Sequence, residues 1–187
     1  YVVNGFGFLF VAGFTAANKL YGGLEMASLS YGYAITTYVG QNLGAKKYRR
    51  IRNGVRSGVY MALITSIVIS GVMVITGRNI LSLFVSGEAG QVKQVLDIAY
   101  KYLFIMAIFL WVLYLLYVYR SAIQGLGNTL IPLASGVVEF CMRVGVALLL
   151  PKLIGEDGIF YAEISAWSGA AILLIVSYVV IIRKYKE

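Results

Sequence analysis

The sequence predicts an all-α polytopic membrane helix bundle, and three observations lead to this fold class. Of its 187 residues, 60% are apolar and only 13% are charged, about half the charged share of an ordinary soluble domain. The mean hydropathy is +0.81. Apolar stretches of about 20 residues, the length needed to cross a bilayer, recur along the chain. A soluble globule needs more polar surface and a disordered chain has fewer apolar residues, so both classes are excluded.

Five stretches are long and apolar enough to be full transmembrane helices. They cover residues 18–41, 55–77, 96–118, 129–150 and 159–182. The apolar segment before them, 1–17, is interrupted by glycines, and we expect it to be the tail of a sixth helix followed by a short turn. Because the chain does not begin with Met, we also expect it to be a piece of a longer protein.

Turn-forming residues separate the predicted helices. The breaks fall at residues 43–47, 77–79, 125–129 and 151–158, which are rich in Gly, Asn, Lys and Pro. Asn128 or Thr129 can cap the helix that follows the third break. Pro132 lies in the first turn of that helix, where its missing N–H costs little.

Basic residues gather in alternate loops. Loop 46–56 holds six Lys and Arg residues, Arg120 follows the third span, and the tail 183–186 adds three more. The positive-inside rule places these loops and the C-terminus in the cytoplasm, as expected for a multi-pass protein of the plasma membrane. Instead of a simple cytoplasmic loop, residues 46–56 can equally well form an amphipathic helix that rests on anionic lipid headgroups. The net charge of +8 therefore indicates a lipid bilayer as partner and not a nucleic acid.

Small residues at four-residue spacing predict close contacts between helices. They are Gly32, Thr36, Gly40 and Gly44 in the first span, Gly54 and Gly58 in the second, and Gly158, Ala162, Ala166 and Ala170 in the last. Such residues let helix backbones approach closely in lipid, where no hydrophobic effect drives helices together. Ordinary bundle packing is the simpler interpretation, and a seam that slides or rocks is the alternative.

Ionisable residues inside an apolar span are costly and are therefore candidate site residues. Glu139 lies about ten residues into the fourth span, which places it about 15 Å deep. Arg143 follows one turn later, so the two side chains are expected to pair on one helix face. The pair either fixes the orientation of the helix, or is functional, with Glu139 exchanging Arg143 for a proton, a sodium ion or a cationic ligand.

Glu25 is a second candidate, because it shares a helix stripe with Ser28 and so faces a close helix contact or the edge of a cavity. Glu163 lies near the end of the last span and is expected to snorkel to the interface. Asp97 and Lys101 are spaced as a solvated i,i+4 pair at the start of the third span.

Aromatic residues offer another kind of candidate site. The chain contains 15 Tyr, 9 Phe and 2 Trp. Tyr31 and Tyr38 lie on one stripe of the first span, and Trp111, Tyr114 and Tyr117 cluster in the third. Such faces can bind flat lipophilic cations through cation–π and stacking contacts. Aromatic residues also pack helix cores and mark membrane interfaces, so both interpretations stay open.

Several kinds of chemistry find no support in the sequence. The chain has no His and one cysteine, Cys141, so a histidine catalyst, an internal disulfide and a Cys/His metal site are excluded. We find no Walker motif, no Ser nucleophile motif and no carbonyl-type selectivity filter. We therefore expect neither enzyme activity nor a bound cofactor.

Several segments, taken in order, resemble the multidrug and toxic compound extrusion (MATE) transporters. The run YVGQNLGAKK at 38–47, with the basic residues after it, is similar to a cytoplasmic loop of that family. The run QGLGNT at 124–129 resembles a second such loop, and the following helix with Glu139 and Arg143 resembles the helix after it. Segment 12–18 fits the start of the eighth helix of the family.

The resemblance implies a protein of twelve helices in two six-helix lobes, of which residues 1–187 are the C-terminal lobe, truncated at its start. It also implies that organic cations are exchanged for Na⁺ or H⁺ by alternating access, through a cavity shared with the missing N-terminal lobe. Some members hold the cation with carboxylates of the tenth helix, but residues 102–118 contain none here. Within this lobe, Glu139 and Glu25 are left as candidate ion ligands.

Two other functions are compatible with the same pattern. A lipid-linked oligosaccharide flippase of the same superfamily would be favoured by a cavity rich in Arg and Lys, whereas Arg143 is the one clearly deep cation. A membrane subunit without transport activity is the other alternative, and it would show no substrate-dependent effect in vesicles.

Overall fold

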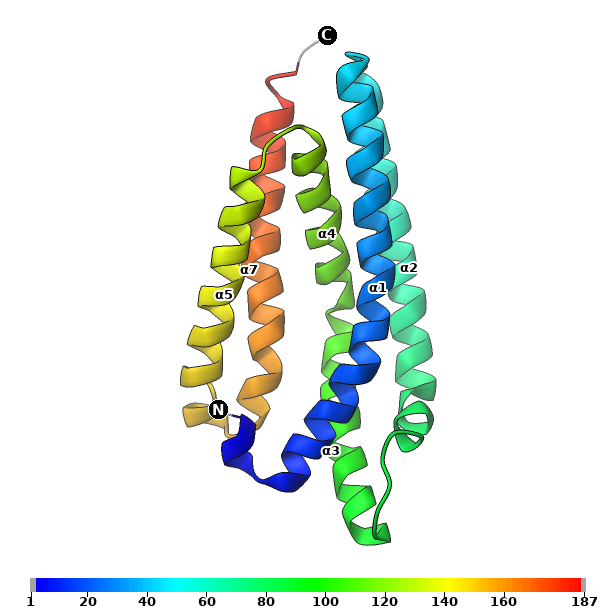
Figure 1. Cartoon of the computed structure of the whole chain (residues 1–187), viewed down its shortest axis with the longest axis vertical. Helices are drawn as coiled ribbons and strands as arrows, with labels where there is room; N and C mark the ends of the chain where they lie inside the picture. The colour runs from blue at the N-terminus through cyan, green and yellow to red at the C-terminus, as the bar shows by residue number, and fades with distance from the viewer. Residues whose placement is uncertain (1–2, 186–187) are drawn as a thin grey trace.

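The computed structural model describes residues 3–185, which form helices and no strand (Figure 1). A short 3₁₀ helix, η1 (Val3–Phe6), comes first. The α-helices are α1 (Phe8–Gly44), α2 (Tyr48–Ser82), α3 (Ala89–Ile108), α4 (Leu110–Gly125), α5 (Leu130–Leu149), α6 (Pro151–Ile154) and α7 (Asp157–Ile182). The long helices stand side by side in an elongated bundle, which confirms the predicted all-α fold class.

Three segments of the described chain are by themselves long and apolar enough to cross a membrane: α2, α5 together with α6, and α7. A fourth is the pair α3 and α4, which is bent by 49° at the break around Phe109. The third predicted span, 96–118, is therefore broken near its middle. Helix α1 is less apolar and is not one of these segments. Its 37 residues nevertheless correspond to about 55 Å, more than the thickness of the hydrocarbon layer.

The first long helix begins earlier than the sequence indicated. The expected turn before residue 18 does not form, because α1 runs without interruption from Phe8. The chain changes direction at Gly7 instead, whose φ of 91° is readily adopted by glycine. The ring of Phe10 is buried and stacks on Phe160 of α7, with 5.6 Å between the ring centroids. Residues 8–17 thus extend the first span, since they pack against α3 and, through Phe10, against α7.

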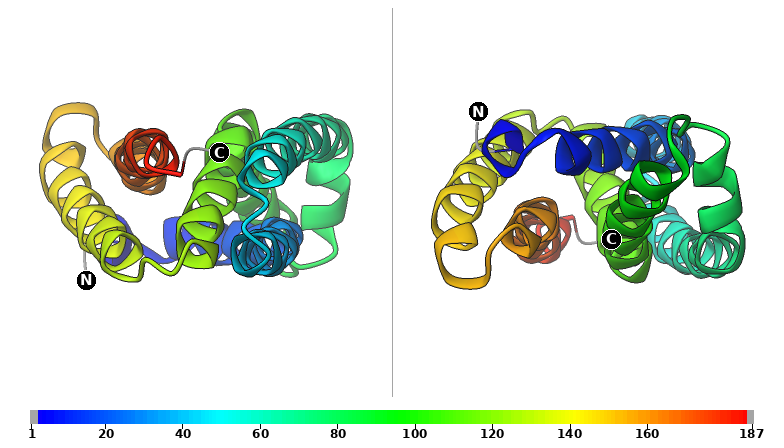
Figure 2. Two further views of the ribbon diagram at one scale, coloured as in Figure 1. Left: turned by 90° about the horizontal axis from the view of Figure 1, so that it is seen from above. Right: turned by 90° about the horizontal axis from the view of Figure 1, so that it is seen from below.

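Helix α4 lies at the centre of the bundle. It packs against α1, α2 and α7, and nine of its residues are buried. Helix α5 packs mainly on α7, and only Pro132 and Ser135 of α5 are buried. Viewed along the bundle axis, α5 and α2 lie at opposite ends of the molecule (Figure 2). The position of α5 therefore depends on its contacts with α7 and on a few polar contacts with α4.

The basic loops lie together at one end of the bundle. The α1–α2 turn, the α4–α5 loop and the end of α7 are at the top of Figure 1, and the α2–α3 loop and the α5–α7 corner are at the bottom. This arrangement agrees with the alternation of loops that the charge pattern predicted. At the third break, Asn128 caps α5 as expected, because its Oδ1 accepts a hydrogen bond from the Ile131 N–H at 3.0 Å.

Two ion pairs link neighbouring helices nearer the other end. Arg78 of α2 binds Asp97 of α3 at 2.6 Å, and Lys101 of α3 binds Asp157 of α7 at 2.7 Å. The predicted Asp97–Lys101 pair is wrong, because each side chain finds a partner of opposite charge on a neighbouring helix. These side chains are 36–56% exposed, so each pair contributes little to stability.

Glycines of the predicted stripes lie where α1 touches its neighbours. A Cβ at Gly32 would lie 2.8 Å from the Oγ of Ser121 on α4, and a Cβ at Gly58 of α2 would overlap Ile35 of α1. A Cβ at Gly44, at the end of the stripe, would meet no atom of another helix within 4 Å. The small-residue pattern therefore marks a true contact surface over part of its length.

The close approach of α4 to α1 at Gly125 predicts a stability effect at this residue. A Cβ there would lie 2.8 Å from the carbonyl oxygen of Thr36 and 2.7 Å from the Cβ of Val39. Gly125→Ala is therefore expected to destabilise the protein by about 1–3 kcal/mol, the usual cost of overpacking, and to lower the melting temperature in detergent. Gly71→Ala is the matched control, because no atom lies within 4 Å of a Cβ at that position. Equal melting temperatures for the two variants would contradict the close packing of α1 on α4.

Candidate functional site

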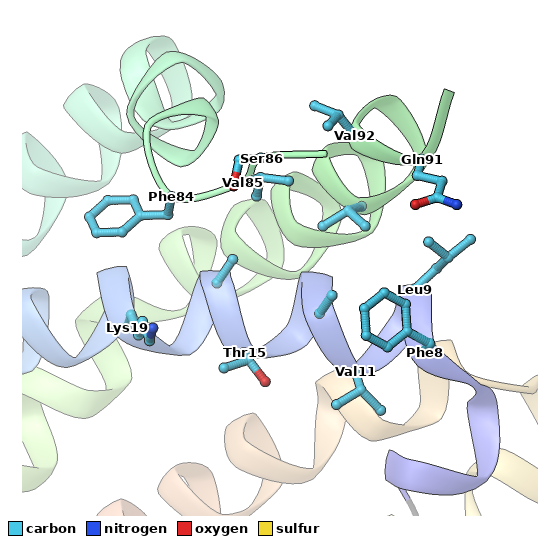
Figure 3. Close-up of a pocket in the computed structure, with 13 residues that line it drawn as sticks. Phe8, Leu9, Val11, Thr15, Lys19, Phe84, Val85, Ser86, Gln91 and Val92 are labelled. Carbon is cyan, nitrogen blue, oxygen red and sulfur yellow. The ribbon is translucent and has the colours of Figure 1, made fainter. Parts of the chain in front are cut away.

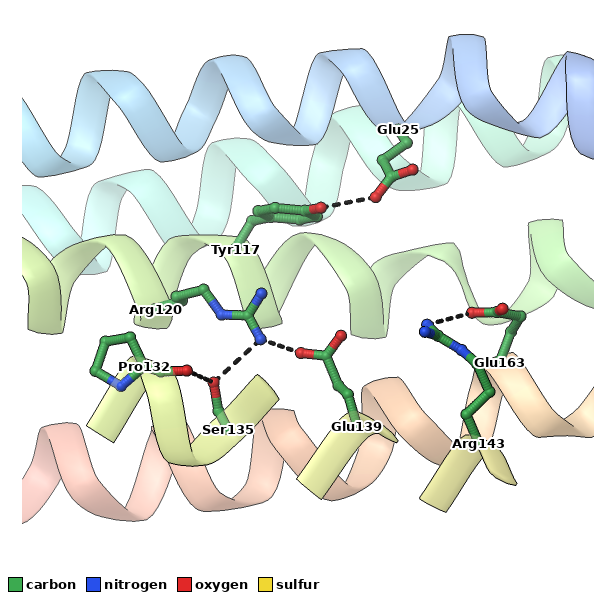
Figure 4. Close-up of polar contacts among 8 residues, drawn as sticks. All are labelled: Glu25, Tyr117, Arg120, Pro132, Ser135, Glu139, Arg143 and Glu163. Carbon is green, nitrogen blue, oxygen red and sulfur yellow. Dashed lines mark hydrogen bonds and ion pairs between the residues drawn. The ribbon is translucent and has the colours of Figure 1, made fainter. Parts of the chain in front are cut away.

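A row of polar residues crosses the bundle from α1 to α7 (Figure 4). Its members are Glu25 of α1, Tyr117 and Arg120 of α4, Ser135, Glu139 and Arg143 of α5, and Glu163 of α7. All of them lie within the long helices, where an unpaired charge is costly. The partners that each residue finds therefore decide which of them are structural and which are free to bind a ligand.

Glu139 is bound by Arg120 and not by Arg143. The Nη2 of Arg120 donates to Oε1 of Glu139, across the contact between α4 and α5. The same nitrogen donates to the hydroxyl of Ser135 at 3.1 Å, and Ser135 in turn donates to the carbonyl of Pro132 at 2.7 Å. The side chains of Arg120 and Glu139 are only 20% and 17% exposed. The predicted Glu139–Arg143 pair is wrong.

Arg143 instead pairs with Glu163, with 2.7 Å between Nη2 and Oε2. Glu163 was expected to snorkel to the interface, but its carboxylate faces α5 and its side chain is 28% exposed. There is a physical reason for both corrections. A pair between Glu139 and Arg143 on one helix would leave Arg120 and Glu163 without partners, whereas the two pairs between helices neutralise all four charges.

Glu25 differs from the other two carboxylates of the row. Its Oε1 accepts a hydrogen bond from the Tyr117 hydroxyl at 2.7 Å, and no Lys or Arg in the described range 3–185 forms an ion pair with it. Ser28, on the same stripe, donates to the backbone carbonyl of Glu25 and not to its carboxylate. The Glu25 side chain is half-buried. Its carboxylate is bound by the neutral Tyr117 hydroxyl and not by a cation.

The row carries an excess of negative charge. It has three carboxylates and two guanidiniums, so its formal net charge is −1, and Glu25 is the carboxylate without a guanidinium partner. The charges of the row can thus accept one positive charge near Glu25 without breaking either ion pair. Tyr117 and Arg120 also line a cavity of about 210 Å³ that is bounded on the α1 side by Gly32 and Thr36, but Glu25 is not one of its lining residues.

A dedicated metal centre is not built into the described residues. Across residues 3–185, no three His, Cys, Asp or Glu side chains lie close enough together to hold a metal ion. A monovalent ion at Glu25 would therefore combine one carboxylate with neutral oxygens. The Tyr117 hydroxyl is the neutral group that the structure places within hydrogen-bond distance of it.

Apart from Tyr117, which belongs to the polar row, the aromatic candidates do not share one face. Tyr31 and Tyr114 lie together, with 5.9 Å between their ring centroids, but Tyr114 is fully buried. The Tyr31 hydroxyl is 2.6 Å from the hydroxyl of Thr65 on α2. Tyr38 lies at the basic end, and Trp111, at the start of α4, is 44% exposed. Their roles in binding stay predictions, and the structure groups only the first two.

A second cavity lies away from this row. It has a volume of about 320 Å³ and is formed by the start of α1, the α2–α3 linker and the start of α3 (Figure 3). Its lining is mostly apolar, and Lys19 is the charged residue among the side chains that line it. None of the predicted site residues lines this cavity, so it is not part of the polar row.

The sequence analysis did not identify Arg120 as a site residue, because it assigned Arg120 to a loop. A signal was present: no Gly or Pro occurs between Leu110 and Gly125, so the helix continues past the end of the apolar stretch. Arg120 then follows Tyr117 by three residues and lies on the same helix face. The pairing of Arg143 with Glu163 had no such signal, since it depends on how α5 and α7 face each other.

Comparison with known proteins agrees with the resemblance drawn from the sequence. The model of the MatE family matches residues 1–149. A protein of Bacillus subtilis (strain 168), described as "Probable multidrug resistance protein YoeA", is 25% identical over 162 residues, which are 87% of this chain. The matched region is 30% of the length of that relative, so the chain spans only a part of it. Since the family model covers well over half of the chain, the protein belongs to the MatE family.

Proposed function

We propose that this chain forms the C-terminal lobe of a secondary antiporter that exports organic cations in exchange for Na⁺ or H⁺. The observation that carries the proposal is the state of Glu25: it is the carboxylate of the row that lacks a cationic partner in the described residues. A half-buried carboxylate with excess negative charge is a binding group for a cation. Membership of the MatE family and the printed description of the Bacillus relative support the same conclusion.

The same charges disfavour the flippase alternative. A lipid-linked oligosaccharide carries phosphate groups, which need free Arg or Lys side chains. Arg120 and Arg143 are each bound to a carboxylate, so the row offers no unpaired positive charge. A cationic substrate fits it better than an anionic one.

Competition at Glu25 explains how the exchange is coupled. One carboxylate can neutralise one positive charge, so the coupling ion and the organic cation displace each other from the same position. Alternating access requires two conformations of the transporter, and each ligand shifts the equilibrium between them only by the difference in its affinity for the two. In this proposal the second wall of the cavity comes from an N-terminal lobe, as the family resemblance implies.

The orientation in the membrane follows from the basic end of the bundle. The α1–α2 turn, the α4–α5 loop and the end of α7 lie at that end (Figure 1). By the positive-inside rule this end faces the cytoplasm, with the protein in the plasma membrane. Export then proceeds from the basic end towards the end that carries the Arg78–Asp97 pair.

The test is transport by the full-length protein in proteoliposomes. Ethidium is the probe cation, and either a sodium gradient or a pH gradient is imposed across the vesicle membrane. We expect ethidium to move against its own gradient with one of these gradients and to stop when the gradient is dissipated. No gradient-driven movement by a monodisperse, folded protein would refute the antiporter and favour a membrane subunit without transport activity.

A further inference from the structure

A groove between α2, α4 and α7 lies at the basic end of the bundle, apart from the polar row. Its volume is about 310 Å³, and α2 and α7 form its two sides because both pack against α4. Two arginines and three tyrosines line it: Arg52, Arg56 and Tyr60 of α2, Tyr119 of α4 and Tyr178 of α7. Val55, Val59 and Ile182 supply an apolar wall. The groove thus combines positive charge with a surface for hydrocarbon.

The groove lies where the helices leave the hydrocarbon layer. In α2, residues 57–77 between Arg56 and Arg78 are uncharged and correspond to about 31 Å of helix, which is the thickness of that layer. On α7, Ile182 lines the groove and is followed at once by Arg183. The arginines of the groove are therefore at headgroup level, and its apolar wall extends towards the acyl chains.

Both arginines of the groove lack a carboxylate partner within the part of the chain that the structure describes. Arg52 donates to the backbone carbonyls of Ile182 and Tyr185 at the end of α7. Arg56 donates to the Tyr60 hydroxyl at 3.2–3.3 Å and lies 5.6 Å from the centre of that ring. A guanidinium has five N–H groups, so each arginine keeps donors for an anion.

We propose that this groove is a binding site for an anionic phospholipid. Arg52 and Arg56 are one helical turn apart on the same face of α2, so one phosphate bridges the two guanidiniums. The glycerol and the start of an acyl chain then lie along Val55, Val59 and Ile182. Basic pockets between transmembrane helices on the cytoplasmic side suit acidic headgroups in this way.

The chemistry of the groove argues against other occupants. Two guanidiniums without carboxylate partners repel an organic cation, so the proposed transport substrate does not fit. A soluble phosphate would satisfy the arginines but would leave the apolar wall unused. The inference does not depend on the proposed antiport, because it concerns different residues and a different ligand.

The experiment measures lipid retained by the full-length protein in native mass spectrometry. Phosphatidylglycerol is added to the delipidated, detergent-solubilised protein, with phosphatidylcholine as the neutral lipid. We expect the wild type to retain phosphatidylglycerol and not phosphatidylcholine, and Arg52→Gln/Arg56→Gln to weaken retention by about tenfold or more. The control is Arg49→Gln/Arg50→Gln, which removes the same charge from exposed positions outside the groove. The control is expected to behave as the wild type.

A second variant separates lipid binding from folding, because Arg52 also holds the end of α7. Val59→Phe fills the groove and keeps every charge, and it is expected to weaken phosphatidylglycerol retention while the protein stays monodisperse. Equal loss in the Arg49/Arg50 control would overturn the site, since the attraction would then be general to the basic segment. Complete displacement of the lipid by inorganic phosphate would also overturn it, because the ligand would then be a soluble anion.

Discussion

Glu25→Gln is expected to reduce ion-driven transport by the full-length protein to the level of empty liposomes while the bundle stays folded. The substitution keeps the size of the side chain and an oxygen that can accept the hydrogen bond from Tyr117. It removes the negative charge that no cation of the described residues neutralises. Because no buried partner is left unpaired, the free energy of unfolding is expected to change little. Loss of transport without loss of stability is thus the expected signature of a cation-binding carboxylate.

The measurement compares gradient-driven ethidium transport with the melting temperature of the same preparations. Glu156→Gln is the matched control, because Glu156 is exposed and forms no ion pair among residues 3–185. This control is expected to transport as the wild type does. A Glu25→Gln protein that transports at the normal rate would remove Glu25 from the mechanism, although the antiporter itself would stand if the wild type passes the transport test.

The sequence predicted the bounds of a helix well where the length of an apolar stretch determines them. Residues 129–150 and 159–182 correspond closely to α5 and α7. The break at Phe109 was not predictable, because the sequence around it is uniformly apolar and has no Gly or Pro. Its position depends on how α3 and α4 each fit against α1, which is a property of the packed bundle.

Only some members of the polar row were predicted as site residues, and their pairing was not predicted. Glu25, Glu139 and Arg143 stand out in the sequence, because charge inside an apolar stretch is rare. Which carboxylate meets which guanidinium depends on the relative rotation of α4, α5 and α7, and periodicity along one helix carries no information about this. Local spacing favoured a pair within α5, but the structure forms both pairs between helices.

The Arg120–Glu139 pair gives the second large expected effect. Glu139→Gln is expected to destabilise the protein by about 3–5 kcal/mol, because it leaves the largely buried Arg120 without a counter-charge. Glu163→Gln, which breaks the more exposed pair with Arg143, is expected to cost less, since the Arg143 side chain is 42% exposed and so less enclosed by the protein than that of Arg120. Thermal unfolding of the purified full-length variants measures the difference. Similar melting temperatures for the two variants would contradict a buried role for the first pair.

The double variant Arg120→Gln/Glu139→Gln decides whether this pair is a structural link or a part of the ion pathway. It removes both charges together, so no buried charge is left unpaired, and most of the stability lost in Glu139→Gln is expected to return. Since the proposed coupling depends on Glu25, the double variant is also expected to keep gradient-driven transport. A double variant that is as stable as the wild type but does not transport would place Glu139 in the ion pathway. In that case the link between α4 and α5 would itself be broken and remade during transport, and the excess charge on Glu25 would not be sufficient for coupling.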